Sequence, residues 1–485
     1  MATDDLFFST IGELNQRLRA RDLSAKEIVH AFGARLAELG PKYNALALPL
    51  TDRARNAAHD VDADLKRQRF RGPLQGIPWG AKDLLSLKNT PTTWGAKPYA
   101  RQTFDYTATA VAKAEKKGAL LLGKLAMVEL AGGPMGYHSA AASLTGPGLN
   151  PWDPTRWSGG SSSGSAIAVA AGCVTFALGS ETVGSILTPC AFCGVTGLRP
   201  TYGLVSRHGA MPLSWTLDKI GPIGRTAEDC GLVLEAIAGG DDKDSGSAGK
   251  SFYYAPQYAR DLKEIHAGFA AVDFAEWAEP AARPDFAKAL DTLRDMGLQT
   301  TAAKLPDFPY GAMVTTILAG EAASVFEPLV ASGRVNELAD AKQIAGFHAA
   351  MELPAKEYLR AMRLRSSLQT ALRALLSDID VLVAPARLGP AGKVADALDR
   401  PPNPDRPRPK DPGLTALIAA ANLAGLPALV LPCGFADGMP IAIQIVGRAF
   451  TENTLLAIGK EFQIRTDWHK RRPLSLTPPD TGTAR

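Results

Sequence analysis

The sequence predicts an α/β fold, because short apolar runs alternate with helical segments and glycine-rich turns between residues 73 and about 240. Residues 119–122 and 174–178 are apolar runs of strand length. A charged helical segment at residues 109–117 directly precedes the first run, which is typical of a helix-to-strand unit. Many of the 46 glycines fall in this stretch, where tight turns or close backbone approaches are expected.

Residues 1–70 are predicted to form a helical region that packs against this body. Ser24 and Glu27 have the spacing of a capping box, which marks a helix start. The apolar residues that follow share one helical face until the Gly-Pro pair at residues 40–41; they are Ile28, Phe32, Leu36 and Leu39.

The second half of the chain is predicted to continue with helices and then strands. Residues 245–375 have mostly helical spacing and carry no chemical motif, so we expect a variable region there. Three later runs are expected to be strands, at residues 379–384, 426–431 and 440–446, and a closing helix is expected at 452–462. Residues 400–412 are rich in proline, which favours a solvated loop over a ligand for a proline-binding domain.

Composition excludes several classes of protein. The 485 residues suggest about three domains at ~150 residues each, although large single-sheet enzymes reach this length. A net charge of +4 is too dilute to favour nucleic acid or an anionic membrane. No signal peptide or run of 18 apolar residues is found, and the five cysteines form no secreted framework. These features favour a cytoplasmic protein, and the C-x-x-C at Cys190 and Cys193 is expected to be two buried thiols.

The most informative segment is residues 157–198, where two serine-rich glycine turns lie 24 residues apart across a helix and a strand. Such turns could place two serines side by side. The first turn, residues 159–165, lacks the lysine of a phosphate-binding loop. It matches the G-x-S-x-G elbow, which would make Ser162 a nucleophile, but the preceding prolines at 151 and 154 oppose the strand that an elbow needs. A flexible linker is a third interpretation.

A serine nucleophile needs a base, and none of the seven histidines lies in a recognisable motif. Lys82 is the alternative, because Gly80, Ala81 and Leu84 surround it in the sequence. Burial would lower the pKa of this lysine, and a neutral lysine is a competent base.

The chain resembles the amidase signature family over nearly its whole length, with residues 250–350 as the part without a clear counterpart. The matching segments are GPLQGIPWGAKD, GKLAMVEL, NPWDP, the two serine turns, CGVTGLRPTYGLVSRHG, DKIGPIGRT and NLAGLPALVLPCG. The resemblance implies a single domain over residues 1–485, built on one large mixed β-sheet with helices on both faces. It implies hydrolysis of a C–N bond through an acyl-enzyme, without a metal or an organic cofactor.

The resemblance also implies the site residues. Ser185 would be the nucleophile, Ser161 the bridging serine after a cis peptide bond, and Lys82 the base. The backbone N–H groups of Thr182, Val183, Gly184 and Ser185 would form the oxyanion hole. Where many members have Asp, Gly and Arg, this chain has Glu181, Val183 and Leu187, which puts a fixed cation beside the nucleophile in doubt.

Two enzymatic hypotheses and one non-enzymatic hypothesis follow from the resemblance. The first is a free-standing amidase acting on small or aryl amides, anilides, carbamates or related urea-derived compounds. The second is the glutamine-hydrolysing component of the tRNA-dependent amidotransferase. That component recognises glutamine through an arginine, matched here by Arg365, and an aspartate, replaced here by Thr415. The third, a binding protein that keeps the triad, is disfavoured because Lys82, Ser161 and Ser185 are all present.

The substrate pocket is less defined by the sequence. We expect it in residues 130–140 and 310–365, with Gly132, Gly133 and Met135 as substrate-binding candidates. An apolar lining is suggested by Tyr137, Tyr310, Met313 and Phe347, although core roles are equally open. The expected partner is a small-molecule amide or carbamate rather than nucleic acid or a membrane, and a homodimer stays open.

Overall fold

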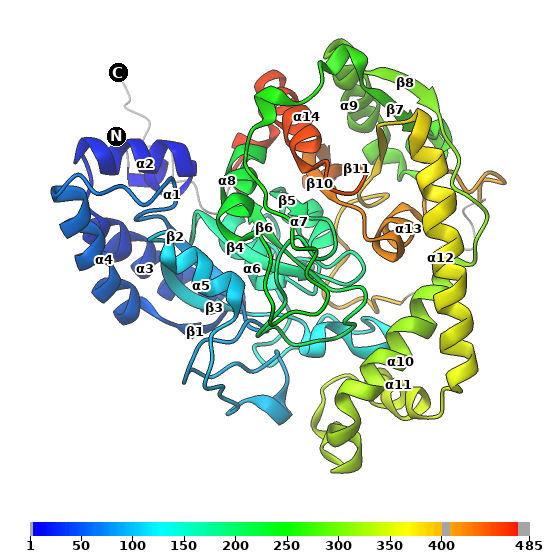
Figure 1. Cartoon of the computed structure of the whole chain (residues 1–485), viewed down its shortest axis with the longest axis horizontal. Helices are drawn as coiled ribbons and strands as arrows, with labels where there is room; N and C mark the ends of the chain where they lie inside the picture. Colours follow the sequence, from blue (N-terminus) through cyan, green and yellow to red (C-terminus); the bar gives the residue numbers. More distant parts are fainter. Residues whose placement is uncertain (1–2, 400–407, 474–485) are drawn as a thin grey trace.

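The computed structural model describes residues 3–399 and 408–473, which form one mixed 11-stranded sheet with flanking helices (Figure 1). The strand order is β1-β3-β2-β4-β6-β5-β10-β11-β9-β7-β8. This confirms the α/β class and the single mixed sheet. Most of the proline-rich segment, residues 400–407, lies outside the described residues, so the prediction of a solvated loop is not tested there.

The strands are β1 (Leu46–Pro49), β2 (Pro78–Lys82), β3 (Leu120–Leu125), β4 (Phe176–Glu181), β5 (Thr196–Arg199), β6 (Lys219–Gly224), β7 (His266–Phe269), β8 (Gln299–Ala302), β9 (Val381–Pro385), β10 (Ala428–Ala436) and β11 (Met439–Gly447). The α-helices are α1 (Thr3–Phe7), α2 (Ile11–Ala20), α3 (Ala25–Lys42), α4 (Thr51–Lys66), α5 (Thr109–Lys116), α6 (Ser163–Ala170), α7 (Leu187–Cys193), α8 (Ala227–Ile237), α9 (Arg283–Asp295), α10 (Tyr310–Ala331), α11 (Ala341–Met351), α12 (Ala355–Asp378), α13 (Leu417–Ala424) and α14 (Glu452–Arg465). Every strand and helix predicted above is found within a few residues of its expected place.

The sheet is parallel where β2 lies between β3 and β4, and antiparallel where β4 meets β6 and where β5, β10, β11 and β9 follow one another. Because parallel neighbours end at the same edge, the carboxyl ends of β2 and β4 lie side by side. Ligands of open α/β sheets bind beyond such ends. This edge is therefore where a site is expected.

Two helical layers cover the two faces of the central strands, as alternate residues of β5 demonstrate. A Cβ built on Gly197 would lie 2.5 Å from Cys190 Sγ of α7, so this face packs against α7. The neighbouring Thr196 accepts a hydrogen bond at its Oγ1 from Gln463 of α14, on the opposite face. Both layers are packed closely enough that β4, β5 and β11 are buried throughout and β10 is buried at every residue except Phe435.

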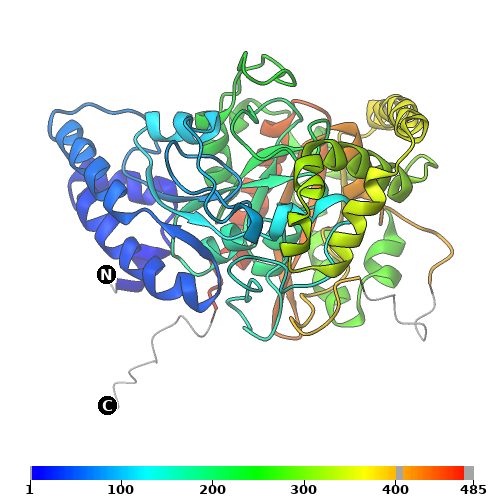
Figure 2. The same ribbon diagram turned by 90° about the horizontal axis from the view of Figure 1, so that it is seen from below.

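The N-terminal helices gather at the β1 end of the sheet (Figure 2). The capping box is confirmed: Ser24 Oγ accepts the Glu27 N–H, and the Glu27 carboxylate accepts the Ser24 N–H. The four-residue edge strand β1 in this helical region was not predicted, because its residues are only partly buried and show no alternation.

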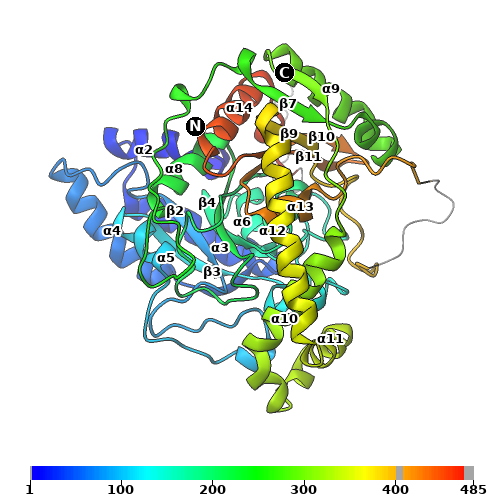
Figure 3. The same cartoon turned by 45° about the vertical axis from the view of Figure 1, so that its right-hand side comes forward.

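Residues 245–375 combine four helices with two strands that were not predicted, β7 and β8, which extend the far edge of the sheet in parallel to β9. The long helix α12 runs along the outside of the molecule and packs against α10, which in turn packs against α11 (Figure 3). Among the described residues, α10 alone has the length and apolar composition of a membrane span, and half of its most apolar window is buried in the protein. It packs against the rest of the protein as a core helix.

The prediction of buried thiols is confirmed. All five cysteines are buried and unpaired, and burial raises the pKa of Cys190 and Cys193.

Candidate active site

The predicted site residues meet at the carboxyl ends of β2 and β4. Lys82 is the last residue of β2, and Ser180 is the next-to-last residue of β4. Ser161 and Ser162 precede α6, and Ser185 lies in the turn between β4 and α7. All five residues are buried, with at most 9% of each exposed.

The Lys82 amine is bonded to hydroxyl groups alone. Its Nζ donates to Ser161 Oγ at 2.7 Å, to Ser180 Oγ at 2.9 Å and to Ser162 Oγ at 3.0 Å. No carboxylate within the described ranges lies at ion-pair distance from it. Burial lowers the pKa of Lys82 to about 7, although the more distant charges of Asp218 and Glu181 act in the opposite direction. At this pKa about half of the molecules hold a neutral amine at pH 7, compared with fewer than about one in a thousand for a free lysine.

The two serine turns lie side by side, as expected from their spacing. The peptide bond between Gly160 and Ser161 is cis, which confirms the expectation from the resemblance. The N–H of Ser162 donates to the carbonyl of Ser185 at 3.2 Å, which joins the turns directly.

Ser162 is occupied by structural hydrogen bonds. Its Oγ accepts from Lys82 and from the N–H of Ser180, and it donates to the Ser180 carbonyl. Residues 150–157 form no strand, so the strand required by a nucleophile elbow is missing here.

The Ser185 hydroxyl contacts Tyr137. The two oxygens are 2.6 Å apart, and either can be the donor. Burial raises the pKa of Tyr137, while hydrogen bonding to Ser185 and Ser161 opposes that rise, so the phenol lies against both serines. Within the described chain the Oγ atoms of Ser161 and Ser185 share no hydrogen bond. Tyr137 was predicted only as a candidate for an apolar lining, and its contact with Ser185 was not predicted.

The turn that carries Ser185 is braced by Glu181. One carboxylate oxygen accepts the N–H groups of Ile186 at 2.8 Å and Leu187 at 3.0 Å. The other accepts from Arg199 at 2.7 Å and from Asn422 at 2.9 Å. Burial would raise the pKa of Glu181, but Arg199, with the hydrogen bonds of Asn422, lowers it to about 2. The fixed cation that Leu187 does not supply is thus supplied behind the turn by Arg199 of β5.

The predicted oxyanion groups occupy this same turn. Gly184 has a φ of +84°, a conformation that favours glycine. Among the hydrogen bonds of the described residues, none uses the N–H of Thr182, Val183, Gly184 or Ser185 as donor. The Thr182 side chain donates to Asp218 at 2.6 Å, which ties the turn to the start of β6.

The candidates Gly132, Gly133 and Met135 lie beneath α11 rather than along either of the two cavities described next. A Cβ on Gly132 would overlap the Tyr137 ring, and one on Gly133 would overlap Gln343. Met135 lies against Gly346 of α11. The absence of a side chain at Gly132 and Gly133 therefore leaves space for the Tyr137 ring and for Gln343 of α11.

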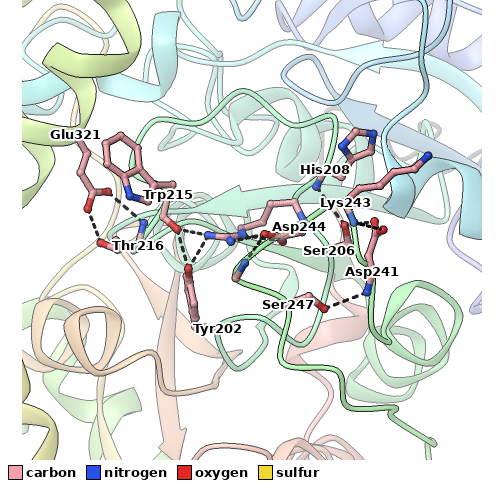
Figure 4. A network of polar contacts seen from close by, with 12 residues as sticks. Tyr202, Ser206, His208, Trp215, Thr216, Asp241, Lys243, Asp244, Ser247 and Glu321 are labelled. Carbon is pink, nitrogen blue, oxygen red and sulfur yellow. Dashed lines mark hydrogen bonds and ion pairs between the residues drawn. The ribbon is translucent and has the colours of Figure 1, made fainter.

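One cavity, of about 240 Å³, lies beside Ser180 and Thr182 and is lined mainly by residues 207–220 and 243–245. Figure 4 shows the polar network of its outer wall, in which Asp244 pairs with Arg207 at 2.5 Å. Tyr202 donates to the Trp215 carbonyl at 2.8 Å in the same network. These contacts hold two loops together over the cavity.

A second cavity, also of about 240 Å³, lies on the α7 side of the turn. Its lining includes Phe192 of α7, Ile418 of α13 and Thr415. A Cβ on Gly184 would lie 3.4 Å from Ile418, so this cavity adjoins the Ser185 turn. No group of three or more potential metal ligands is found in residues 3–399 and 408–473.

A buried lysine held by serine hydroxyls, next to a second serine on a turn whose N–H groups donate no hydrogen bond to the described residues, is an arrangement that suits a serine hydrolase with lysine as its base. Residues 27–456 match the Amidase family model, and the chain belongs to the amidase signature family of hydrolases acting on C–N bonds.

Known relatives cover nearly the whole chain. A component of the glutamyl-tRNA(Gln) amidotransferase of Roseiflexus castenholzii is 36% identical over 502 residues, covering 96% of this chain and 98% of that protein. The peptide amidase of Stenotrophomonas maltophilia has a TM-score of 0.83 at 29% identity, covering 96% of this chain and 98% of that one. A vestigial protein complex related to the origins of an s-triazine catabolic enzyme has a TM-score of 0.85 at 29% identity, with 94% and 98% covered.

The Glu181–Arg199 pair gives a prediction on stability. Arg199→Met leaves a carboxylate buried without its cation, which costs about 3–5 kcal/mol in such pairs. We expect a loss of this size in the free energy of unfolding, measured by urea denaturation. In the double variant Arg199→Met/Glu181→Gln the loss is expected to be smaller than the sum of the two single losses. Additive losses would contradict direct coupling of the two side chains.

Proposed function

We propose that this protein is a free-standing amidase that hydrolyses a small or aryl amide, anilide or carbamate through a serine acyl-enzyme. The observation that carries the proposal is the buried Lys82 amine with a pKa of about 7, bonded to Ser161 beside the Ser185 turn. A neutral amine at this place can accept a proton, which an ordinary lysine cannot do near pH 7.

The proposed reaction begins with proton removal from Ser185 by neutral Lys82 through the Ser161 hydroxyl. Ser185 Oγ bonds to the amide carbon, and the N–H groups of residues 182–185 receive the negative oxygen, where each donor is worth about 10²–10³ in rate. The relay returns the proton to the nitrogen as the C–N bond breaks. Water then hydrolyses the ester by the reverse path.

Tyr137 fits this proposal as a group that orients Ser185. Its raised pKa keeps the phenol protonated, so the O–H can donate to Ser185 Oγ as negative charge develops there. The Tyr137 phenol also occupies the path along which the proton would pass between Ser185 and Ser161. Substrate binding therefore has to bring the hydroxyls of Ser161 and Ser185 together.

The glutamine-hydrolysing amidotransferase component is the second candidate, favoured by its 36% identity over the full length. The hydrogen bonds of Arg365 and Thr415, the two positions matched to glutamine recognition, oppose this candidate. The Arg365 guanidinium donates to the carbonyls of Leu423 and Thr216, and the Thr415 hydroxyl donates to the Pro412 carbonyl. Asp273 borders the same cavity as Thr415, but it is 1% exposed, and both of its oxygens accept the N–H of Leu414. Burial raises its pKa to about 6, so it is a poor partner for an ammonium.

We also propose a single domain over residues 1–485 and a cytoplasmic location, with a small-molecule amide or carbamate as the partner. One sheet joins strands from residue 46 to residue 447, which supports the single domain. The five buried thiols, which form no disulfide, support the cytoplasmic location.

Ser185→Ala is expected to lower kcat for an aryl amide by about 10⁴-fold or more, because it removes the nucleophile. The unfolding midpoint should change little, since the hydroxyl's hydrogen bond is to Tyr137. A serine-directed fluorophosphonate should add its mass to the peptide carrying Ser185 in the wild type. Labelling of Ser162 instead would restore the elbow hypothesis, and Ser377→Ala, on the exposed end of α12, is the matched control.

The pH dependence of the hydrolysis rate follows from the lowered pKa of Lys82. Because the base must be neutral, kcat/KM should rise with pH through an apparent pKa near 7 and be lost as Lys82 is protonated below it. Lys82→Ala and Lys82→Arg should both lose most of the rate, since a guanidinium stays protonated. An active Lys82→Arg enzyme would show that the position is only a fixed cation; the exposed Lys97→Arg is the control.

Glutamine is expected to be a poor substrate even at millimolar concentration, because Thr415 cannot pair with its ammonium. Hydrolysis of glutamine, measured as ammonia release, should be at least about 100-fold slower than hydrolysis of a good aryl amide, which is the size of one lost charged interaction. Efficient release, or co-purification with other amidotransferase components, would favour the second candidate. Thr415→Asp is a weaker converse test, because other pocket groups also differ.

A further inference from the structure

Asp218, the residue just before β6, has a carboxylate that is fixed in place near the base without touching it. Its Oδ1 accepts the hydroxyl of Thr182, the first residue of the oxyanion turn, at 2.6 Å. Its Oδ2 accepts two backbone N–H groups of the preceding loop, each at 2.9 Å. The carboxylate lines the first cavity together with Ser180, whose hydroxyl is bonded to Lys82. Three donors therefore hold this group beside the cavity that borders the base.

The charge of Asp218 has no counter-ion among the described residues. Lys219 follows it in the chain, but no ion pair joins the two side chains, and the buried Lys219 Nζ has no hydrogen-bond partner. Burial lowers the pKa of Lys219 well below its ordinary value, which favours the neutral amine. Burial also raises the pKa of Asp218, and its three hydrogen-bond donors oppose that rise because they favour the ionised carboxylate.

Glu181, the other carboxylate whose charge acts on Lys82, is compensated by a cation. It pairs with Arg199 at 2.7 Å. A carboxylate and a guanidinium in contact act on a distant group as a dipole, whose effect falls off faster than that of a single charge. Because Asp218 has no such partner, we expect its charge to be the stronger influence on the amine. It is indeed the larger of the two charge interactions that oppose the lowered pKa of Lys82.

Other charged or titratable groups surround the two side chains, and none of them forms an ion pair with Asp218 in the described part of the chain. They are the Lys124–Asp83 pair next to Lys82, Tyr137 against Ser185, the Arg207–Asp244 pair, His208 against Tyr106, the exposed Lys243, and Glu321 and Arg365, which bond to the loop before Asp218. The charge interactions of Lys82 are with Asp218 and Glu181 instead.

We propose that Asp218 acts on the reaction through Lys82, as the uncompensated negative charge that keeps this amine basic enough to take the proton of Ser185. The inference rests on the proposed function, because it needs Lys82 to be the base. Burial alone would make the amine a weak base, and proton transfer is efficient when the pKa of the base lies near the working pH. Asp218 is therefore a positioning residue, which does not itself touch the substrate.

Asp218→Asn tests the charge with little change of shape. The amide oxygen can accept the two backbone N–H groups, and the amide N–H can donate to the Thr182 hydroxyl, so the hydrogen bonds are kept. Loss of the negative charge destabilises protonated Lys82, so the acid limb of kcat/KM for an aryl amide should move to lower pH. We expect a move of about half a unit to one unit, the size of one charge interaction across a partly buried site. The plateau at high pH should fall by at most about tenfold, because the base is weaker.

Asp242→Asn is the matched control, because it removes an exposed carboxylate close to the cavity, where water and salt screen the charge. It should leave the acid limb in place. Unfolding curves show whether Asp218→Asn is folded, and Asp218→Ser, which is smaller and keeps a hydroxyl, replaces it if it is not. An acid limb that stays in place or moves to higher pH in the folded variant would overturn the proposal.

Direct titration of the Lys82 amine separates this proposal from the proposed function. In Ser185→Ala with ¹³C-labelled lysine, the Cε resonance of Lys82, assigned by its loss in Lys82→Arg, reports protonation of the amine without any turnover. Adding Asp218→Asn should lower the midpoint of this titration by the same amount as the acid limb. Equal midpoints would overturn the role of Asp218. A lowered midpoint in a protein whose wild type hydrolyses no aryl amide would support that role and overturn the proposed function alone.

Discussion

The rest of the site depends on one constraint, which is that the Lys82 amine is enclosed by protein without a carboxylate beside it. A buried cation is costly unless it is paired, and pairing it with a carboxylate would keep its proton in place. The fold instead surrounds the amine with three hydroxyls, which bond to both protonation states. Lys124 of β3 provides the contrast within the same sheet: it is equally buried, but it pairs with Asp83 at 2.8 Å. Only dipoles lie beside Lys82, whereas Asp83 opposes the lowering of the pKa of Lys124 that burial causes.

The charged groups that support this site lie behind the Ser185 turn rather than beside Lys82. Glu181 and Arg199 form a fully buried pair behind the Ser185 turn, and the carboxylate is used to hold the N–H groups at the start of α7. The turn is thereby fixed from behind, while the N–H groups of residues 182–185 donate no hydrogen bond to the described residues. Glu181 has one methylene more than the aspartate common in the family, and its reach to both Arg199 and α7 explains why this departure is tolerated.

Sequence patterns predicted what is local or carried by family motifs. The capping box at Ser24, the main strands, the serine turns and the cis bond before Ser161 all belong to these groups. Edge strands β1, β7 and β8 were missed, because short, partly exposed strands show no clear alternation. The contacts of Arg199 with Glu181 and of Tyr137 with Ser185 could not be predicted from the sequence, since the partners lie 18 or more positions apart in the chain and are brought together only by the fold. Thr415 was identified from its spacing, but the neighbouring Asp273, 142 positions earlier, was not.

The aromatic contact next to Ser185 has an optical consequence. The ring of Tyr137 meets the indole of Trp157 edge to face, with ring centres 5.8 Å apart and planes at 70°. Trp157 is 6% exposed, and its Nε1 has no hydrogen-bond partner among the described residues. Indole emission depends on such close neighbours, so the emission of Trp157 is expected to change when Tyr137 moves. Because the chain has seven tryptophans, a variant that keeps Trp157 as its single tryptophan would report whether the phenol rests on Ser185 or has been displaced by a ligand.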